Sequence, residues 1–268
     1  MKRALAALAA LAAALFFTGP FFWQVLTSLR PDDDLVSAGL PRALSVESYR
    51  RAFATQPLGR AVWNSAVVAT GTTALCLLVG AAAAFALAKL ELRGRRLFLG
   101  GALLCSMFPS VATVSALYLL IRALGLRDHL LGLLIPYTTF ALPMTIWIMH
   151  GFFRGLPDAI FRAAVLDGCT PLQAFWKVML PLAAPGLGTT AILVFISAWN
   201  ELLYALTFIS SPEARTVPVA ISMFAGEHKE PWGEIAAASV VAMLPVIVAA
   251  LVFQRWIVSG LTAGAVKG

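Results

Sequence analysis

Residues 61–88 read AVWNSAVVATGTTALCLLVGAAAAFALA, a run of 28 residues without a formal charge. About 20 apolar helical residues are enough to cross the hydrocarbon core of a bilayer. The run ends at residues 89–96, KLELRGRR, where four of the eight residues are basic. A chain segment in lipid must satisfy its own backbone hydrogen bonds, and an α-helix does so. We therefore expect a transmembrane helix over residues 61–88, followed by a charged loop.

Five further apolar stretches of similar length surround this run. They cover residues 4–29, 97–121, 130–150, 187–210 and 235–254. The chain has 20 basic and 13 acidic residues, but only Glu201 lies inside the six stretches. A composition of 60% hydrophobic and 12% charged residues excludes an ordinary soluble domain and a disordered chain. The sequence predicts an all-α polytopic membrane protein with six transmembrane helices, forming a single domain over residues 1–268.

The charged loop at residues 89–96 also indicates the orientation in the membrane. Basic residues directly beside apolar spans are hard to translocate and stay in the cytoplasm. We therefore place both termini in the cytoplasm, including the tail at residues 255–268. The net charge of +7 is explained by topology, so it does not indicate nucleic-acid binding.

The first apolar stretch, residues 4–29, fits either a signal peptide or a first membrane span. Lys2 and Arg3 before an alanine-rich run resemble a signal peptide, but the apolar run continues to Leu29. Because this is long for a signal peptide, we expect an uncleaved first span.

The three cysteines have no CxxC spacing, so we expect neither a disulfide nor a zinc site. They are Cys76, Cys105 and Cys169.

The segment at residues 155–186, between the fourth and fifth stretches, contains consistent signals for two short helices. Gly168 suits the left-handed position that ends a helix. Thr170 suits the cap of a second helix, with Pro171 at its first position and Gln173 at the capping-box spacing. The sequence predicts two helices joined at an elbow. An interfacial helix on lipid headgroups is the alternative, but it would need no elbow and would carry more basic residues.

Three short runs in this segment resemble the EAA loop of bacterial ABC importer permeases. They are Arg162-Ala163-Ala164, Asp167-Gly168 and Leu180-Pro181. The resemblance implies that the segment is a coupling helix that docks on a separate cytoplasmic ATPase. It assigns ATPase coupling to Arg162, Ala163, Ala164, Asp167, Gly168, Phe175, Leu180 and Pro181. Arg162 departs from the family, which usually has glutamate there, so the partner contact of that glutamate is in doubt.

The resemblance extends over almost the whole chain and is strongest with the carbohydrate branch, similar to the maltose and trehalose permeases. Trp199-Asn200-Glu201 matches this branch, and the end of the chain at residues 260–268 resembles the tail of the second permease subunit. The resemblance implies that this tail contacts the ATPase subunits through Gly264, Val266 and Lys267. Without it, a Gly- and Ala-rich end would indicate only a frayed terminus.

The resemblance also implies the partners and the cargo. We expect a sibling permease, an ATPase dimer, an extracytoplasmic substrate-binding protein and the lipid of a bacterial cytoplasmic membrane. The cargo implied is a disaccharide or oligosaccharide. The chain has no GxxxxGK phosphate loop, so ATP and Mg²⁺ are expected on the partner ATPase. We expect no catalytic residue, bound cofactor or metal in this chain.

Four residues are candidates for the translocation path: Trp199, Asn200, Glu201 and Ser110. A charge at the centre of a membrane helix is costly, so Glu201 is expected to face a polar interior. It either lines the path or forms an interhelical hydrogen bond that stabilises the bundle, and the sequence leaves both open. Trp199 offers a flat face of the kind that stacks on sugar rings. Ser110 follows Pro109, in a cluster of hydroxyl residues.

Two other functions fit an apolar six-span chain less well. A stand-alone secondary transporter usually contains inverted repeats and several buried charges, and neither is visible here. An intramembrane enzyme needs a nucleophile with a base, or a set of metal ligands, inside the spans. The sequence has no HExxH motif and no paired aspartates in its apolar stretches.

Overall fold

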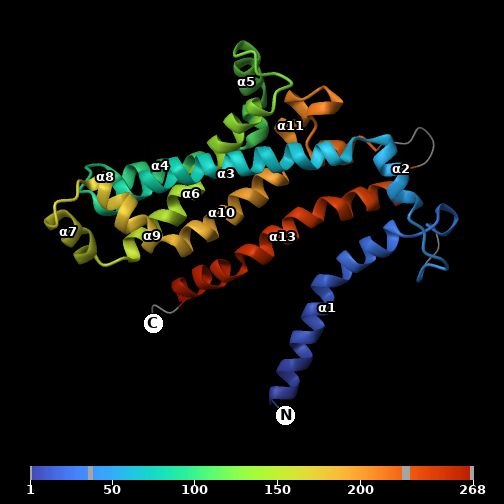
Figure 1. Cartoon of the computed structure of the whole chain (residues 1–268), viewed down its shortest axis with the longest axis horizontal. Helices are drawn as coiled ribbons and strands as arrows, with labels where there is room; N and C mark the ends of the chain where they lie inside the picture. Colours follow the sequence, from blue (N-terminus) through green and yellow to red (C-terminus); the bar gives the residue numbers. More distant parts are fainter. Residues whose placement is uncertain (1, 36–38, 225–229, 266–268) are drawn as a thin grey trace.

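The computed structural model describes residues 2–35, 39–224 and 230–265, and over these ranges it is helical without strands. Most of the long helices run lengthwise through the molecule, the N-terminal helix diverges from them, and the short helices gather near the ends and on one side (Figure 1). The helices are α1 (Lys2–Ser28), α2 (Glu47–Thr55), α3 (Leu58–Lys89), α4 (Arg95–Ser106), α5 (Ser110–Ala123), α6 (Leu130–Gly155), α7 (Asp158–Leu166), α8 (Pro171–Ala174), α9 (Leu180–Leu182), α10 (Ala184–Trp199), α11 (Leu203–Phe208), α12 (Val217–Ser222) and α13 (Trp232–Ala265). Short 3₁₀ turns lie at Asp32–Asp34 and Pro212–Ala214, and a π-helix at Phe175–Met179.

Four of these helices are long and apolar enough to cross a membrane. They are α1, α3, α6 and α13, and they contain the predicted stretches at residues 61–88, 130–150 and 235–254 and most of the stretch at residues 4–29. Two bent helix pairs raise the number to six among the described residues if each pair counts as one span. The all-helical membrane fold is thus confirmed, while the six-span count stays a prediction.

The third apolar stretch, residues 97–121, is not the single helix that we predicted. It is divided into α4 and α5, which meet at an angle of 92° around Met107-Phe108-Pro109. Proline has no backbone N–H to continue a helix, and it drives the preceding residue out of helical conformation. The hydroxyl of Ser106 donates to the carbonyl of Leu103 at 2.7 Å, which adds a second hydrogen bond to a carbonyl in the last turn of α4.

The fifth stretch, residues 187–210, is also interrupted. Helix α10 ends at Trp199, α11 begins only at Leu203, and α10 is itself bent by 79° from the preceding helical segment. The prediction that Glu201 lies at the centre of a helix is therefore wrong. Its side chain instead accepts hydrogen bonds from backbone N–H groups in the first turn of α11. In a continuous helix these N–H groups would already be bonded to backbone carbonyls of the preceding turn.

The core is built where α3 packs against α6 and α10. Small residues on α3 allow a close approach: a Cβ added to Gly80 would lie 2.4 Å from a methyl carbon of Thr145 on α6. Small residues serve this purpose widely in membrane helix packing. Ala81 and Ala84 lie on the same part of α3 and are fully buried. The α3–α6 pair thus forms a rigid centre to which both ends of the molecule are attached.

Helix α1 diverges from this centre. In Figure 1 it points away from the other long helices, and none of its most apolar window is buried within the chain. Phe16 and Phe17 are 76% and 70% exposed. Such a surface needs an apolar environment, supplied by lipid or by another membrane helix.

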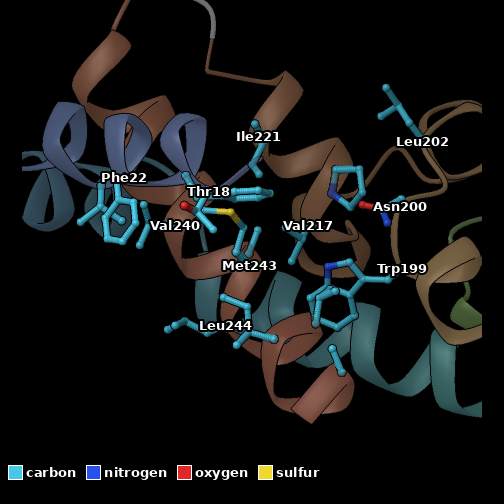
Figure 2. Close-up of a pocket in the computed structure, with 17 residues that line it drawn as sticks. Thr18, Phe22, Trp199, Asn200, Leu202, Val217, Ile221, Val240, Met243 and Leu244 are labelled. Atoms are coloured by element: carbon cyan, nitrogen blue, oxygen red, sulfur yellow. The ribbon is translucent and has the colours of Figure 1, made fainter. Parts of the chain in front are cut away.

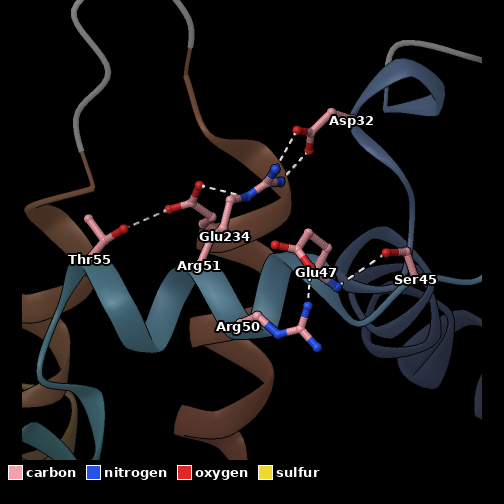
Figure 3. A network of polar contacts seen from close by, with 7 residues as sticks. All are labelled: Asp32, Ser45, Glu47, Arg50, Arg51, Thr55 and Glu234. Carbon is pink, nitrogen blue, oxygen red and sulfur yellow. Dashed lines mark hydrogen bonds and ion pairs between the residues drawn. The ribbon is translucent and has the colours of Figure 1, made fainter.

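A network of charged side chains joins three elements at the end of the molecule where α2 lies (Figure 3). Arg51 of α2 donates to both carboxylate oxygens of Asp32, at 2.7 and 2.5 Å. Its Nε lies 3.3 Å from the carboxylate of Glu234, in the first turn of α13. The network therefore fixes α2 between the segment after α1 and the start of α13. If the termini are cytoplasmic, this is the outer end.

Candidate functional site

The segment at residues 155–186 forms the elbow that its local signals predict. Helix α7 ends before Gly168, which has a left-handed φ of +87°. The hydroxyl of Thr170 accepts from the N–H of Gln173 at 3.3 Å, and the Gln173 side chain accepts from the N–H of Thr170 at 2.9 Å. This capping box starts α8 with Pro171 at its first position. Two short helices consequently project at the end of the molecule opposite α2 (Figure 1).

The predicted coupling residues divide into exposed and buried groups. Five of them are exposed: Arg162, Ala163, Asp167, Gly168 and Pro181. Leu180 is partly buried, whereas Ala164 and Phe175 are only 6% and 2% exposed. The buried pair holds the segment to the rest of the chain and offers little surface to a partner.

Exposed apolar side chains at the elbow were missed by the sequence analysis. Leu166 is 87% exposed, Leu172 65% and Trp176 48%, and Val165 beside them is 43% exposed. We call these four residues the elbow patch. Leu166 and Leu172 flank Gly168 at the tip, a position that no helical stripe in the sequence marks. A patch of this kind on a non-spanning segment indicates an interaction site.

An aromatic cluster attaches the elbow to the long helices. The ring of Phe175 lies 5.1 Å from Phe85 of α3 and 6.2 Å from Phe153 of α6, measured between centroids. Phe161 of α7 lies 5.6 Å from the same Phe85. Aromatic pairs at these distances gain packing energy beyond the burial of their area. The two halves of the elbow are thus joined through one ring of α3.

The Trp199-Asn200-Glu201 motif lies at the break between α10 and α11. The Glu201 carboxylate accepts from the N–H of Tyr204 at 3.0 Å and of Ala205 at 3.3 Å. A carboxylate at these N–H groups satisfies donors that the first turn of a helix leaves open, and it interacts favourably with the positive end of that helix. The Glu201 carboxylate therefore stabilises the start of α11, and its role in the translocation path stays a prediction.

Trp199 and Asn200 line a wide cavity of about 850 Å³ (Figure 2). In Figure 2 both lie across the cavity from Phe22 of α1, with Val217 of α12 and Met243 of α13 between them. Trp199 is only 3% exposed and stacks on Phe195 at 5.7 Å, so most of its ring is covered. The Asn200 amide is exposed and donates to the carbonyl of Ile196 at 2.9 Å.

Ser110 and Glu201 belong to a second, smaller site on α5, α6 and α11. The Tyr204 hydroxyl donates to the carbonyl of Ser110 at 3.1 Å and bonds to the Thr113 hydroxyl at 2.7 Å. Tyr204 also lines a cavity of about 80 Å³ with Glu201 and Tyr137. The Tyr137 hydroxyl donates to the Glu201 carbonyl at 3.4 Å. The structure thus connects Ser110 to Glu201 through Tyr204, which the sequence analysis did not select.

The predicted tail contacts are only partly within the described structure. Gly264 falls within the backbone bounds of α13. Val266 and Lys267 lie outside the described residues. Their contact with an ATPase therefore remains an expectation.

Comparison with known proteins identifies the kind of protein that has this architecture. Residues 76–263 match the family described as the binding-protein-dependent transport system inner membrane component. The trehalose transport system permease protein SugB of Mycobacterium tuberculosis is 47% identical, over 93% of this chain and 92% of its own. The trehalose/maltose transport system permease protein MalG of Thermococcus litoralis is 38% identical, over 100% of this chain and 98% of its own.

The fold is also similar to that of a solved transporter. The structure of a bacterial ABC transporter involved in the import of the acidic polysaccharide alginate matches with a TM-score of 0.78. The match covers 95% of both chains at 24% sequence identity. At this identity the comparison supports the fold alone.

Proposed function

Since the chain belongs to the family of binding-protein-dependent transport system inner membrane components, we propose that it is the permease subunit of an ATP-driven sugar importer. The cargo class follows from its relatives, which are named as permeases for trehalose and maltose. Membership of a transport family leaves the intramembrane enzyme without support, and dependence on a binding protein argues against a stand-alone secondary transporter.

The elbow patch carries the proposal that the chain is driven by a separate ATPase. Its four apolar side chains are exposed on a segment too short to span, which follows α6 in the chain. Exposed apolar surface of this kind marks a protein or a membrane contact, and the resemblance of the segment to the EAA loop favours a protein partner here. In the proposed mechanism, ATP closes the ATPase dimer, the elbow moves with it, and the spans rotate as rigid bodies so that the path opens on the other side. ATP and Mg²⁺ bind to the ATPase and not to this chain.

We assign the sugar path to the region around the break at residues 200–202. Asn200 and Trp199 contribute to the wide cavity, whose remaining lining is mostly apolar. Glu201 and Ser110 act indirectly: the Glu201 carboxylate bonds to the start of α11, and the Ser110 carbonyl accepts from the Tyr204 hydroxyl, which joins α11 to α5. A break in a membrane helix is tolerated where the free backbone lines a cavity or is satisfied by neighbouring groups.

The proposed assembly contains a sibling permease, two ATPase subunits and an extracytoplasmic substrate-binding protein. The exposed face of α1 supports a membrane partner, and lipid covers what remains. In this arrangement both termini are cytoplasmic, and the end that carries the network of Figure 3 faces the binding protein. The family description, which names a binding-protein-dependent transport system, supports the substrate-binding protein among these partners.

A single leucine tests the ATPase assignment. Leu166→Asp places a charge on the most exposed side chain of the elbow patch, and we expect it to abolish co-purification of the ATPase from detergent while the chain still inserts in the membrane. The matched control is Leu40→Asp, a leucine 78% exposed in the loop before α2. This control should retain the ATPase. If the Leu166→Asp variant retains it too, the elbow patch is not the docking surface.

A further inference from the structure

Lys89 is the last residue of α3, and its side chain is only 1% exposed. Lysine at the end of a membrane helix usually extends its ammonium toward water. Here the ammonium is directed inward and makes two short hydrogen bonds. It donates to the carbonyl of Leu156 at 2.6 Å and to the carboxylate of Asp158 at 2.6 Å.

The two acceptors lie on opposite sides of Pro157, in the connection between α6 and α7. Helix α6 ends at Gly155, and α7 begins at Asp158. The two residues between them, Leu156 and Pro157, are extended, with ψ angles of 137° and 133°. Lys89 therefore bonds to the chain just before and just after Pro157. A residue of a third helix thus joins both sides of the junction at which the elbow leaves the spans.

The charges around Asp158 favour its ionised form. The hydrogen bond from Lys89, followed by the charges of Lys89 and Arg162, holds the pKa of the Asp158 carboxyl below its ordinary value. Arg162 is one helical turn further along α7, where the resemblance to the EAA loop leads one to expect glutamate. A glutamate there would lie at the i,i+4 position from Asp158 and repel it, whereas arginine attracts it. This departure from the family pattern is consistent with a carboxylate that must stay charged.

The aromatic cluster alone does not fix the direction of α7. Burial of apolar area is non-directional and aromatic pairs tolerate several ring arrangements, whereas a hydrogen bond weakens steeply as its geometry departs from linear. Two bonds from one ammonium to atoms on both sides of Pro157 define an angle between α6 and α7. They also connect that angle to α3, the helix that packs against α6 and α10.

We propose that Lys89 is a positioning residue that fixes the angle of α7 to the ends of α3 and α6, so that displacement of the elbow is transmitted to α3. This inference rests on the proposed function, because it assumes that α7 is moved by an ATPase. Lys89 acts through Asp158 and Leu156 and touches neither sugar nor nucleotide. Its loss uncouples ATP hydrolysis from transport and leaves assembly intact.

The test uses the full complex, with sibling permease, ATPase and binding protein, reconstituted in liposomes. Asp158→Asn removes the charge at an exposed position and so preserves folding. We expect it to retain the ATPase, and to lower the trehalose or maltose taken up per ATP hydrolysed by about threefold or more, the size typical of a lost coupling contact. Lys89→Gln should have the same effect. The double variant should be no worse than either single variant, because the two changes remove one interaction.

Conservative and matched controls separate positioning from simple stability. Asp158→Glu and Lys89→Arg keep the ion pair, and each should recover most of the uptake per ATP. Glu91→Gln makes the same charge change at an exposed acid two residues from Lys89 and should leave the ratio unchanged. A structural role alone would lower yield and thermal stability without changing the ratio.

Other results would overturn the inference. An unchanged ratio in Asp158→Asn would do so, as would effects of Lys89→Gln and Asp158→Asn that multiply in the double variant. If the unmodified complex contains no ATPase, the proposed function itself fails, and this inference fails with it. The first two outcomes leave the proposed function standing, so the two failures are distinguishable.

Discussion

The two ends of the molecule both attach short helices to long spans, but they use different physical means. At one end, Arg51 joins Asp32 and Glu234 in a network whose arginine side chain is 37% exposed (Figure 3). At the other, the elbow is held chiefly by the ring of Phe175, which is 2% exposed, together with the pair of Lys89, 1% exposed, and Asp158, 68% exposed. Exposed ion pairs contribute little to stability, whereas a buried aromatic side chain contributes several kcal/mol.

The difference in burial bears on how each end responds when its proposed partner moves. A solvated network can exchange its partners at little cost, which suits a surface that receives and releases a binding protein. A buried cluster loses contacts when its members separate, so it moves as a unit. We infer that the elbow end transmits motion and that the α2 end adapts to its partner.

The largest expected effect tests the buried end. Phe175→Ala removes the ring that contacts α3 and α6, and large-to-small changes of this kind cost about 3–5 kcal/mol. We expect a clear fall in the unfolding temperature of the purified protein in detergent. The control is Trp176→Ala, its neighbour, which is 48% exposed and should cost far less. Equal losses for the two variants would show that the cluster around Phe175 is not the main attachment of the elbow.

The fold was predictable from the sequence where the physical signal is local. Lipid requires satisfied backbone bonds over about 20 residues, so α3, α6 and α13 follow from composition alone. The elbow followed because Gly168 and the Thr170 to Gln173 capping box are signals within a few residues. These features need no knowledge of the tertiary structure.

The rest depends on contacts between distant residues. The break after Trp199 is stabilised by Glu201 bonding to α11, and nothing in the apolar run from 187 to 210 separates that arrangement from a continuous helix. The hydrogen bond between Thr113 of α5 and Tyr204 of α11 joins residues 91 positions apart in the sequence. Lys89 and Asp158 are 69 positions apart. Exposure of Leu166 is likewise a property of the elbow tip, which sequence periodicity does not reveal.

A smaller effect is expected at the network of Figure 3. Arg51→Gln removes the bonds to Asp32 and the ion pair with Glu234, and we expect a loss of less than about 1 kcal/mol, because the side chain is more than one third exposed. Unfolding temperatures at low and high salt give the measurement, and the difference from the unmodified protein should shrink in about 1 M salt. Arg50→Gln, which removes an exposed pair with Glu47, is the control. A loss as large as that of Phe175→Ala would remove the contrast between the two ends.

The smallest expected effect concerns pH, and it compares one carboxylate at the elbow with one in a loop outside the spans. The pKa of Asp158 is lowered chiefly by its hydrogen bond from Lys89, and that of Asp128 by the backbone N–H groups of Ser211 and Ser210. A carboxyl group whose pKa is lowered on folding contributes stability that is fully present above its unfolded pKa of about 4, and that is lost only as pH falls through the lower folded value.

The stability that the Asp158 and Asp128 carboxylates contribute should therefore not change between about pH 8 and about pH 5, since neither carboxylate titrates there. The measurement is the difference in unfolding temperature between the unmodified protein and Asp158→Asn, followed over that range, with Asp128→Asn as the second series. Each difference in unfolding temperature should stay constant over this range. The Glu91→Gln variant, measured in the same way, gives the effect of removing one negative charge at another exposed site. A difference that shrinks on going from about pH 7 to about pH 5 would mean that the carboxylate is protonated there, against the lowered pKa. For Asp158, that result would also make the link between Lys89 and α7 dependent on pH between about 7 and about 5.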